Sequence, residues 1–368
     1  MKILIVKLSS LGDVVHAMPA VQDIRQAYPD AQIDWVVERG FAPLVRRCKG
    51  VHRVIACELR HWRQDLFSAQ TRQAWRLFKT ELQLEHYDAV IDLQGLSKSA
   101  LVAWLARLAP GGKRYGLAGR SEGSSFEAPA RWVAHVAVKV PEHIHAVTRS
   151  RELCAAAFHY TVPFLMPYGL LAHENHAPKA IKNVAFKAGL KGVVALVHGT
   201  SRADKEWPLA HWRELALLLN AAGFGVALPH GSATEEEVSN AIASGLPHAQ
   251  VWPRLALDSL TNALATCAGV IGVDSGLSHI AVALDLAHVQ IYNFDTAWRT
   301  GPLPLLSGAP QPQSVPQRPV GLHHPSQHTL RQRSVYAQPT PSVDAVWAAW
   351  ESVNAACFSG PGRTRVPG

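Results

Sequence analysis

Two turns of the sequence combine residue types that bind phosphate groups or move protons, and the first is SSLGD (9–13). Its small residues, with Gly12, would let the backbone approach a ligand closely. Asp13 stands where a helix is expected to begin, so its carboxylate would be ionised and stabilised by the helix dipole. A single aspartate after a strand is most often a helix cap. Its position at the end of the first strand favours a ligand-binding role here.

The second turn, HGTSRADKEWP (198–208), follows another apolar run and precedes a helical pattern. The hydroxyls of Thr200 and Ser201, together with the Lys205 ammonium, suit a diphosphate. Taken alone, the segment would fit a solvated turn, with its lysine facing water, better than a phosphate site. Glu235, in the TEEE run after the next strand, could bind a ribose or simply begin a solvated helix.

A related segment, GVDSGLSH (272–279), strengthens the phosphate interpretation. The amides of residues 275–277 would open a helix at the end of a strand, which predicts an anion site. Asp274 would lie beside that site, where it could accept hydrogen bonds from sugar hydroxyls. His279 would lie near the phosphates, although a buried structural role for it also fits.

Basic residues are concentrated between Arg39 and Lys79, where ten Lys or Arg face two acids. This segment alone carries +8, which equals the net charge of the chain. Arg60 and Arg63 lie at its centre in LRHWRQ (59–64), a loop-like stretch whose guanidinium groups could bind carboxylate or phosphate. A solvated basic surface is the alternative. A nucleic-acid site is less favoured, because no nucleic-acid-binding module surrounds the cluster.

Several common motifs are missing from the sequence. There is no G-x-G-x-x-G, so a dinucleotide-dependent dehydrogenase loses most of its support, and no G-x-x-x-x-G-K-[ST] occurs. There is also no D-x-D, which argues against a metal-dependent glycosyl-transfer site of the GT-A type. The five cysteines are scattered and form no C-x-x-C, a pattern typical of reduced thiols in the cytosol.

The elements that must position these residues are short apolar strands alternating with helices, which indicates parallel sheets covered on both faces. In the first half we expect strands at 2–8, 33–38, 51–56, 88–93 and 114–117. The alternation stops at a linker, 166–186, and then restarts. In the second half we expect strands at 193–198, 224–230, 249–252, 269–274 and 288–292, an irregular stretch at 301–340 and a last helix at 342–356.

Length and composition agree with two globular domains. The chain has 368 residues, of which 48% are hydrophobic and 17% charged, with a net charge of +8. That charge favours an anionic partner: nucleic acid, a membrane surface or an acidic small molecule. No apolar stretch is long enough to span a membrane, and the N-terminus does not match a cleaved signal.

Together, six segments resemble the lipopolysaccharide heptosyltransferases, over nearly the whole chain to about residue 292. They are KLSSLGDVVHAMPA (7–20), DWVVERGFA (34–42), RHWR (60–63), DLQGLSKSA (92–100), TSRADKEWP (200–208) and VDSGLSH (273–279). The form of the first segment is similar to members that act on Kdo, rather than to those that add the second heptose. Two stretches depart from the family: NFDTAW (293–298) replaces a GPTDP-like turn, and 301–340 matches nothing.

The resemblance implies an α/β fold of the GT-B class, in which two Rossmann-like doubly wound domains face each other across a cleft. Residues 1–165 would bind the acceptor and 187–340 the ADP-heptose donor, with the 342–356 helix packing back onto the first domain. The implied reaction moves L-glycero-D-manno-heptose from ADP-heptose to the inner Kdo of Kdo2-lipid A, with inversion and without a metal or other cofactor. The implied location is cytoplasmic, in peripheral contact with the anionic inner-membrane surface, and no nucleic acid is involved.

The resemblance also implies roles for individual residues. Asp13 would be the catalytic base, and Lys205 would stabilise the leaving group. Further donor-binding residues would be Thr200, Ser201, Glu235, Leu255, Asp274, Ser275, Gly276 and His279. Acceptor-binding residues would be Lys7, Ser10, Arg60, Arg63, Lys98, Arg120 and His145. The alternatives are a related transferase with another core acceptor, a nucleotide-sugar epimerase, and a glycolipid-binding protein on the same scaffold.

Overall fold

The chain divides into two compact units. The computed structural model describes residues 1–65, 68–165, 167–172, 189–303 and 331–359. One unit comprises Met1–His173 with Ala256–Asn262, and the other Glu174–Leu255 with Ala263–Gly368. The change from the first unit to the second falls within the predicted linker, most of which lies outside the described residues.

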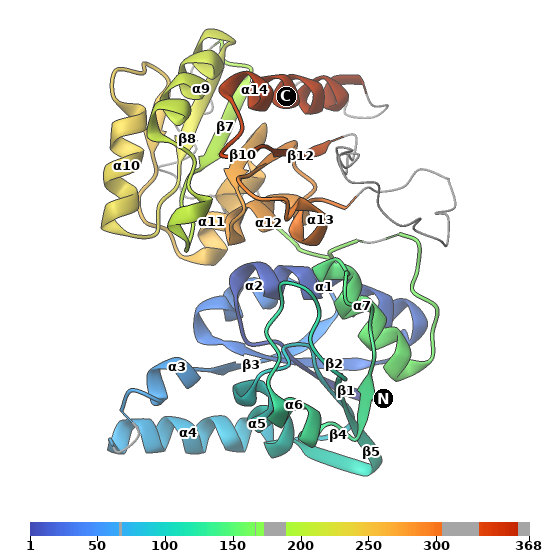
Figure 1. Cartoon of the computed structure of the whole chain (residues 1–368). Coiled ribbons are helices and arrows are strands. Elements are labelled where there is room, and N and C mark those ends of the chain that lie inside the picture. Colours follow the sequence, from blue (N-terminus) through green and yellow to red (C-terminus); the bar gives the residue numbers. More distant parts are fainter. Residues whose placement is uncertain (66–67, 166, 173–188, 304–330, 360–368) are drawn as a thin grey trace, which may run out of the picture. The chain divides into compact units, whose positions relative to one another are not determined.

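The first unit is built on a six-stranded parallel sheet in the order β3-β2-β1-β4-β5-β6 (Figure 1). Its strands are β1 (Lys2–Val6), β2 (Gln32–Glu38), β3 (Val51–Cys57), β4 (His86–Asp92), β5 (Arg107–Leu117) and β6 (Val136–Val138). Four of the five residues of β1, KILIV, are buried, as expected for a strand covered on both faces. Because β1 pairs with β2 on one side and β4 on the other, the strand order reverses there. The loops after β1 and β4 therefore meet at the switch point, where α/β folds bind ligands.

Helices cover both faces of this sheet (Figure 1). They are α1 (Leu11–Ala27), α2 (Ala42–Val45), α3 (Leu59–Trp62), α4 (Ala69–Leu82), α5 (Ser97–Leu105), α6 (Ala128–Val133) and α7 (Ala146–Phe158). α1 packs against α7, whereas α5 packs against α6. Between Arg39 and Phe41 the chain forms a single 3-10 turn. No helix in the described parts of either unit is long and apolar enough to cross a membrane.

The second unit repeats the plan with the strand order β12-β11-β10-β7-β8-β9. Its strands are β7 (Gly192–Val197), β8 (Phe224–Leu228), β9 (Ala249–Val251), β10 (Gly269–Val273), β11 (His288–Tyr292) and β12 (Gln332–Tyr336). Its helices are α9 (Leu209–Ala221), α10 (Ala233–Ala243), α12 (Gly276–Ala283), α13 (Ala297–Thr300) and α14 (Val343–Ser359), with a 3-10 turn at Ala203–Lys205. The helix α11 (Leu257–Ala265) belongs to the first unit up to Asn262 and to the second from Ala263. β7 pairs with β8 and β10, so the second switch point lies between the loops after β7 and β10.

The last helix, α14, forms where expected. Its apolar face packs on the second sheet. Val346 and Trp350 are buried in the core of the second unit, where the Trp350 ring lies 5.6 Å from that of Phe224. Gly269 makes room for the indole, because a Cβ there would lie 2.6 Å from Trp350 Cζ3. Apolar spacing shows that a helix buries a face, but not which sheet that face covers.

Several elements differ from the sequence prediction. β6 and α6 were not expected, and β12 lies inside the stretch expected to be irregular. β12 has the sequence QRSVY and, among the described strands, pairs only with β11. It is therefore an edge strand, and its polar composition does not resemble that of a buried strand. LRHW, expected as a loop, forms the single helical turn α3.

The thiols agree with the expectation of reduced cysteines. Cys48, Cys57, Cys154 and Cys267 are free and buried. Burial raises the pKa of Cys48 and of Cys267 to about 12, so both stay protonated at neutral pH. These cysteines therefore behave as small apolar core residues.

Candidate active-site residues in the two units

Asp13 lies in the turn that joins β1 to α1, at the switch point of the first sheet. It is the third residue of α1, and its Oδ2 accepts hydrogen bonds from the Ser10 amide at 3.1 Å and the Ser10 hydroxyl at 3.0 Å. The Lys7 Nζ lies 3.6 Å from Asp13 Oδ1 and donates to the Leu93 carbonyl at 3.2 Å. The structure thus brings together three residues predicted to serve catalysis or acceptor binding.

The surroundings of Asp13 keep its carboxylate ionised. Burial alone would raise its pKa, but the Lys7 charge, the Ser10 hydrogen bonds and the Arg149 guanidinium together lower the pKa below its ordinary value. Burial and Arg149 lower the pKa of Lys7, whereas Asp13 opposes that change. Arg149, on α7, donates to Ser121 Oγ at 3.0 Å. No motif marks Arg149 in the sequence, so only the packing of α7 on α1 reveals its role.

The loop after β4 fixes the shape of the Asp13 turn. Gln94 Oε1 accepts from the Leu8 amide at 2.8 Å, and Gln94 Nε2 donates to the Ser9 carbonyl at 2.6 Å. Buried Asp92 in turn accepts from the Gln94 amide at 2.8 Å. Lys98, at the start of α5, donates from its Nζ to Ser9 Oγ at 2.8 Å. Lys98 is therefore anchored in the same turn that carries Asp13.

A buried glutamate that sequence reasoning missed lies beside this turn. Glu38, at the carboxyl end of β2, is 9% exposed, and its Oε1 has no hydrogen-bond partner among the described residues. Burial raises the Glu38 pKa, while the charges of Lys98 and Arg60 oppose that rise. Arg60, on α3, also donates its backbone amide to this carboxylate. Glu38 thus links two of the predicted acceptor-binding cations.

The remaining predicted acceptor residues lie on other loops. Arg63 follows α3 and lines a cavity together with Lys98. Arg120 lies after β5, in a cavity of about 510 Å³ that Lys139 also lines. His145 is the N-cap of α7 and accepts from the Val147 amide at 3.1 Å through Nδ1. Its ring lies 6.0 Å from that of His16, one helical turn after Asp13.

In the second unit, the Asp274 carboxylate contacts two residues that are predicted to bind the sugar donor, Lys205 and His279. Its Oδ2 accepts from Lys205 Nζ at 2.6 Å, and its Oδ1 lies 3.3 Å from His279 Nε2. Burial would raise the pKa of Asp274, but His279 and Lys205 lower it well below its ordinary value. The carboxylate is therefore ionised at neutral pH and holds the Lys205 side chain in place.

The two lysine–aspartate pairs expose opposite charges. In the first unit Lys7 is 3% exposed and Asp13 37%, so the carboxylate is the accessible member. In the second unit Asp274 is 6% exposed and Lys205 21%, so the ammonium is the accessible member. An accessible carboxylate can accept a proton, whereas an accessible ammonium can stabilise an anion.

The other predicted donor-binding residues follow neighbouring strands of the second sheet. Ser275 is the N-cap of α12, whose first amides, beginning at Gly276, have no partner within the helix. Glu235 on α10 accepts from the Gly231 amide at 2.6 Å. Gly199 admits this carboxylate, because a Cβ there would lie 2.7 Å from Glu235 Oε1. All the predicted donor residues lie at the carboxyl-end edge of this sheet: Thr200, Ser201 and Lys205 after β7, Glu235 after β8, Leu255 after β9, and Asp274, Ser275, Gly276 and His279 after β10.

The segment NFDTAW, which departs from the family pattern, has a positioning role. Asn293 Nδ2 donates to the carbonyls of Asp204 and Glu206, at 3.1 and 2.9 Å, on either side of Lys205. Asn293 Oδ1 accepts from Thr340 Oγ1 at 2.8 Å. The hydrogen bonds of Asn293 therefore hold the segment that carries Lys205 in position.

Comparison with known proteins decides the family. The model of glycosyltransferase family 9 (heptosyltransferase) matches residues 75–332. Lipopolysaccharide heptosyltransferase 1 of Escherichia coli K12 is 40% identical over 296 residues, which cover 79% of this chain and 88% of that protein. The chain belongs to glycosyltransferase family 9. It is therefore a glycosyltransferase related to the heptosyltransferases of lipopolysaccharide synthesis.

Solved structures of a family 9 enzyme confirm the fold. E. coli heptosyltransferase WaaC with ADP has a TM-score of 0.77 and 32% identity, covering 95% of this chain and 99% of that one. WaaC with ADP-2-deoxy-2-fluoro heptose has a TM-score of 0.72 at the same identity and coverage. The predicted α/β class with two Rossmann-like sheets is thus confirmed.

Within the described parts of the chain, no group of three His, Cys, Asp or Glu residues could hold a metal ion.

Proposed function

We propose that this glycosyltransferase moves L-glycero-D-manno-heptose from ADP-heptose to the inner Kdo of Kdo2-lipid A, with inversion at the anomeric carbon. The observation that carries the proposal is the opposite exposure of the two lysine–aspartate pairs. An inverting displacement needs a base for the acceptor hydroxyl and a cation for the departing diphosphate. Asp13 and Lys205 have the chemistry and the accessibility that these two roles require.

Asp13 would act as the base. As the acceptor hydroxyl attacks the anomeric carbon of heptose, its proton passes to the exposed Asp13 carboxylate. The lowered pKa of Asp13 keeps the group in its basic form across neutral pH. Lys7 stays beside the carboxylate throughout, and Ser10 fixes the orientation of Oδ2. The hydrogen bonds that Gln94 accepts from the Leu8 amide and donates to the Ser9 carbonyl hold the turn in place, which preserves this geometry.

Lys205 would stabilise the leaving group. The bond between the anomeric carbon and the diphosphate oxygen breaks with both electrons going to ADP, whose charge rises as it departs. The partly exposed Lys205 ammonium and the first amides of α12 offer donors for that charge. Asp274 would also accept hydrogen bonds from heptose hydroxyls, and Glu235 from the ribose. The relative solved with ADP-2-deoxy-2-fluoro heptose supports this choice of donor.

The acceptor assignment rests on charge. Lys7 and Lys98 lie at the Asp13 turn, and Arg60 lies beside Glu38. A sugar acid attached to a phosphorylated lipid presents carboxylate and phosphate groups to such cations. An acidic glycolipid explains this cluster better than nucleic acid does, because no nucleic-acid-binding module surrounds it.

A lipid acceptor also requires the enzyme to meet a membrane surface, and we place that contact on α5 and α6. These helices pack together and carry Trp104 and Trp132, which are 61% and 78% exposed. Arg131 is exposed on α6 beside Trp132. Indole rings with neighbouring cations favour the headgroup region of an anionic bilayer. This face supports peripheral attachment to the cytoplasmic leaflet of the inner membrane.

The decisive experiment measures ADP release from ADP-L-glycero-D-manno-heptose, with and without Kdo2-lipid A. We expect release to require the acceptor and to yield a heptosylated product by mass spectrometry. Asp13→Asn should lower kcat by about 10²–10⁴, the usual contribution of a general base, while ADP-heptose binding stays largely intact. Asp30→Asn, an exposed site beyond the C-terminal end of α1, is the matched control. Wild-type activity in Asp13→Asn would exclude the base assignment.

The alternatives give different results in the same assay. A transferase with another core acceptor would bind the donor but release no ADP with Kdo2-lipid A. An epimerase would convert the nucleotide sugar without any acceptor. A glycolipid-binding protein would retain its ligand in Asp13→Asn and release ADP under no condition.

A further inference from the structure

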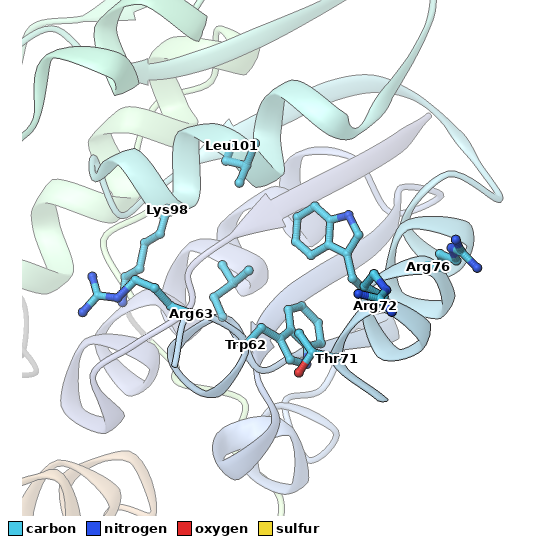
Figure 2. A pocket seen from close by; sticks show the side chains of 9 residues that line it. Trp62, Arg63, Thr71, Arg72, Arg76, Lys98 and Leu101 are labelled. Carbon is cyan, nitrogen blue, oxygen red and sulfur yellow. The ribbon is translucent and has the colours of Figure 1, made fainter. Parts of the chain in front are cut away.

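A second cavity in the first unit lies next to the Asp13 turn and shares Lys98 with it. It has a volume of about 570 Å³ and is formed by side chains of α3, α4 and α5 and of the residue that follows α3 (Figure 2). That volume lies in the range of roughly 300–1,000 Å³ typical of small-molecule sites. The chemistry proposed above gives this cavity no role.

The wall of the cavity is mainly apolar. Trp62 and Trp75 pack edge to face with their ring centroids 5.7 Å apart, and Phe78 lies behind Trp62 at 5.5 Å. Leu101 projects from α5 across the cavity from these rings and is 41% exposed (Figure 2). A dry wall of aromatic and aliphatic groups gains free energy by covering hydrocarbon rather than water.

Four cations surround this apolar wall. Arg63, Arg72, Arg76 and Lys98 all line the cavity, and none of the described residues that line it is acidic. Arginine and lysine can contribute their methylene stems to an apolar wall while their charged ends remain in water. The cavity therefore combines a hydrocarbon-binding interior with a rim that attracts phosphate.

Lys98 connects the cavity to the Asp13 turn. It lines the cavity with its side chain, and its Nζ donates to Ser9 Oγ at 2.8 Å. Ser9 is four residues before Asp13 in the turn between β1 and α1. Lys98 is thus shared by the cavity and the Asp13 turn, so one extended molecule could contact both.

We infer that this cavity binds an acyl chain of the phosphorylated lipid acceptor, while its four cations bind the phosphate groups of the same molecule. The inference rests on the proposed function, because it assigns the lipid part of that acceptor. A phosphate-bearing hydrocarbon is the ligand that an apolar wall with a cationic rim recognises.

The first test measures binding of butyl and octyl phosphate, below their micelle concentrations, by calorimetry. A fully buried methylene contributes about 0.8 kcal/mol, roughly a fourfold change in affinity. We expect octyl phosphate to bind at least about tenfold more tightly than butyl phosphate. Equal affinities, or binding no tighter than that of inorganic phosphate, would show that only charge is recognised and would overturn the inference.

Two pairs of variants localise the ligand. Leu101→Glu places a carboxylate in the apolar wall, and we expect it to weaken octyl phosphate binding at least about tenfold. Leu77→Glu, at a 64% exposed position of α4 that does not line the cavity, should have no effect. Arg76→Glu should weaken the binding of butyl, octyl and inorganic phosphate, whereas Lys79→Glu, with the same change of charge on the same helix, should not. Equal effects within either pair would place the ligand elsewhere.

The acceptor assays separate this inference from the proposed function. With Kdo2-lipid A, Leu101→Glu should raise KM several-fold, and with the fully deacylated acceptor its KM should match that of the wild type. Transfer to neither acceptor in the wild type would refute the proposed function itself. If the wild type transfers heptose to both acceptors and Leu101→Glu changes KM equally for each, the proposed function stands. The inference that the cavity binds an acyl chain is then refuted.

Discussion

Replacing Asp274 with asparagine tests whether its two cationic partners depend on the charge of its carboxylate. Asp274 is 6% exposed and contacts Lys205 at 2.6 Å and His279 at 3.3 Å. Hydrogen bonds that involve a charged group contribute about 1.5–3 kcal/mol each. Asparagine keeps one acceptor oxygen, and Lys205 is 21% exposed, so solvent screens part of that interaction. We therefore expect Asp274→Asn to lower the free energy of unfolding by about 2–3 kcal/mol.

Scanning calorimetry measures this loss directly. For a unit of this size, each kcal/mol shifts Tm by about 2–4 °C, so the transition of the second unit should fall by roughly 4–12 °C. Asp204→Asn is the matched control, since it removes an exposed ion pair with Arg202 from the same segment. Such surface pairs contribute little to stability, so no measurable shift is expected. Equal Tm values for Asp274→Asn and Asp204→Asn would refute the reasoning.

The pH dependence gives an independent test of the same interaction. The pKa of Asp274 is lowered by folding, so its contribution to stability is fully present above the unfolded pKa of about 3.9. The contribution decreases as pH falls below that value toward the lowered folded pKa. The Tm difference between wild type and Asp274→Asn should therefore be constant near neutral pH and shrink in acid. A difference that persists unchanged at the lowest accessible pH would contradict the linkage.

Two further predictions follow from the first unit. Arg149→Met removes a charge that lowers the pKa of Asp13, so the acidic limb of the pH profile of kcat/KM should move to higher pH. An acidic limb at the wild-type pH would show that Arg149 does not affect the Asp13 carboxylate. Replacing Trp104 and Trp132 with alanine should reduce co-sedimentation with anionic vesicles, whereas Leu217→Ala, at a 57% exposed site in the second unit, should not. Equal vesicle binding by the tryptophan variant and the wild type would exclude α5 and α6 as the membrane contact.

The sequence predicted the parts of the fold that depend on local pattern. Buried runs such as VVALVH, with a polar turn after them, identified the strands and the loops that follow their carboxyl ends. The edge strand β12 was not predicted, because its QRSVY segment needs only one neighbour and can remain polar. The sequence alone also leaves open which sheet α14 covers, because its periodic apolar face fits either one.

The candidate site shows the same division between local and long-range information. Asp13, Lys205 and Asp274 stand in recognisable turns, so their loops could be named from the sequence. Arg149 and Glu38 could not, since each reaches the Asp13 turn only through packing of α7 or β2. Which member of each ion pair is buried is likewise a property of the fold and not of any motif.

That burial decides what each pair can do. An exposed lysine beside a buried aspartate, and a buried lysine beside an exposed aspartate, have the same composition and nearly opposite chemistry. In the first unit, Lys7 directly follows the buried strand β1 and is itself buried, while the start of α1 leaves Asp13 accessible, so the pair offers a proton acceptor. In the second unit, Asp274 directly follows the buried strand β10 while Lys205 stands on a short turn, so the pair offers a cation. In the proposed reaction, one side chain would accept the proton and the other would stabilise the departing anion, because each sheet buries a different partner.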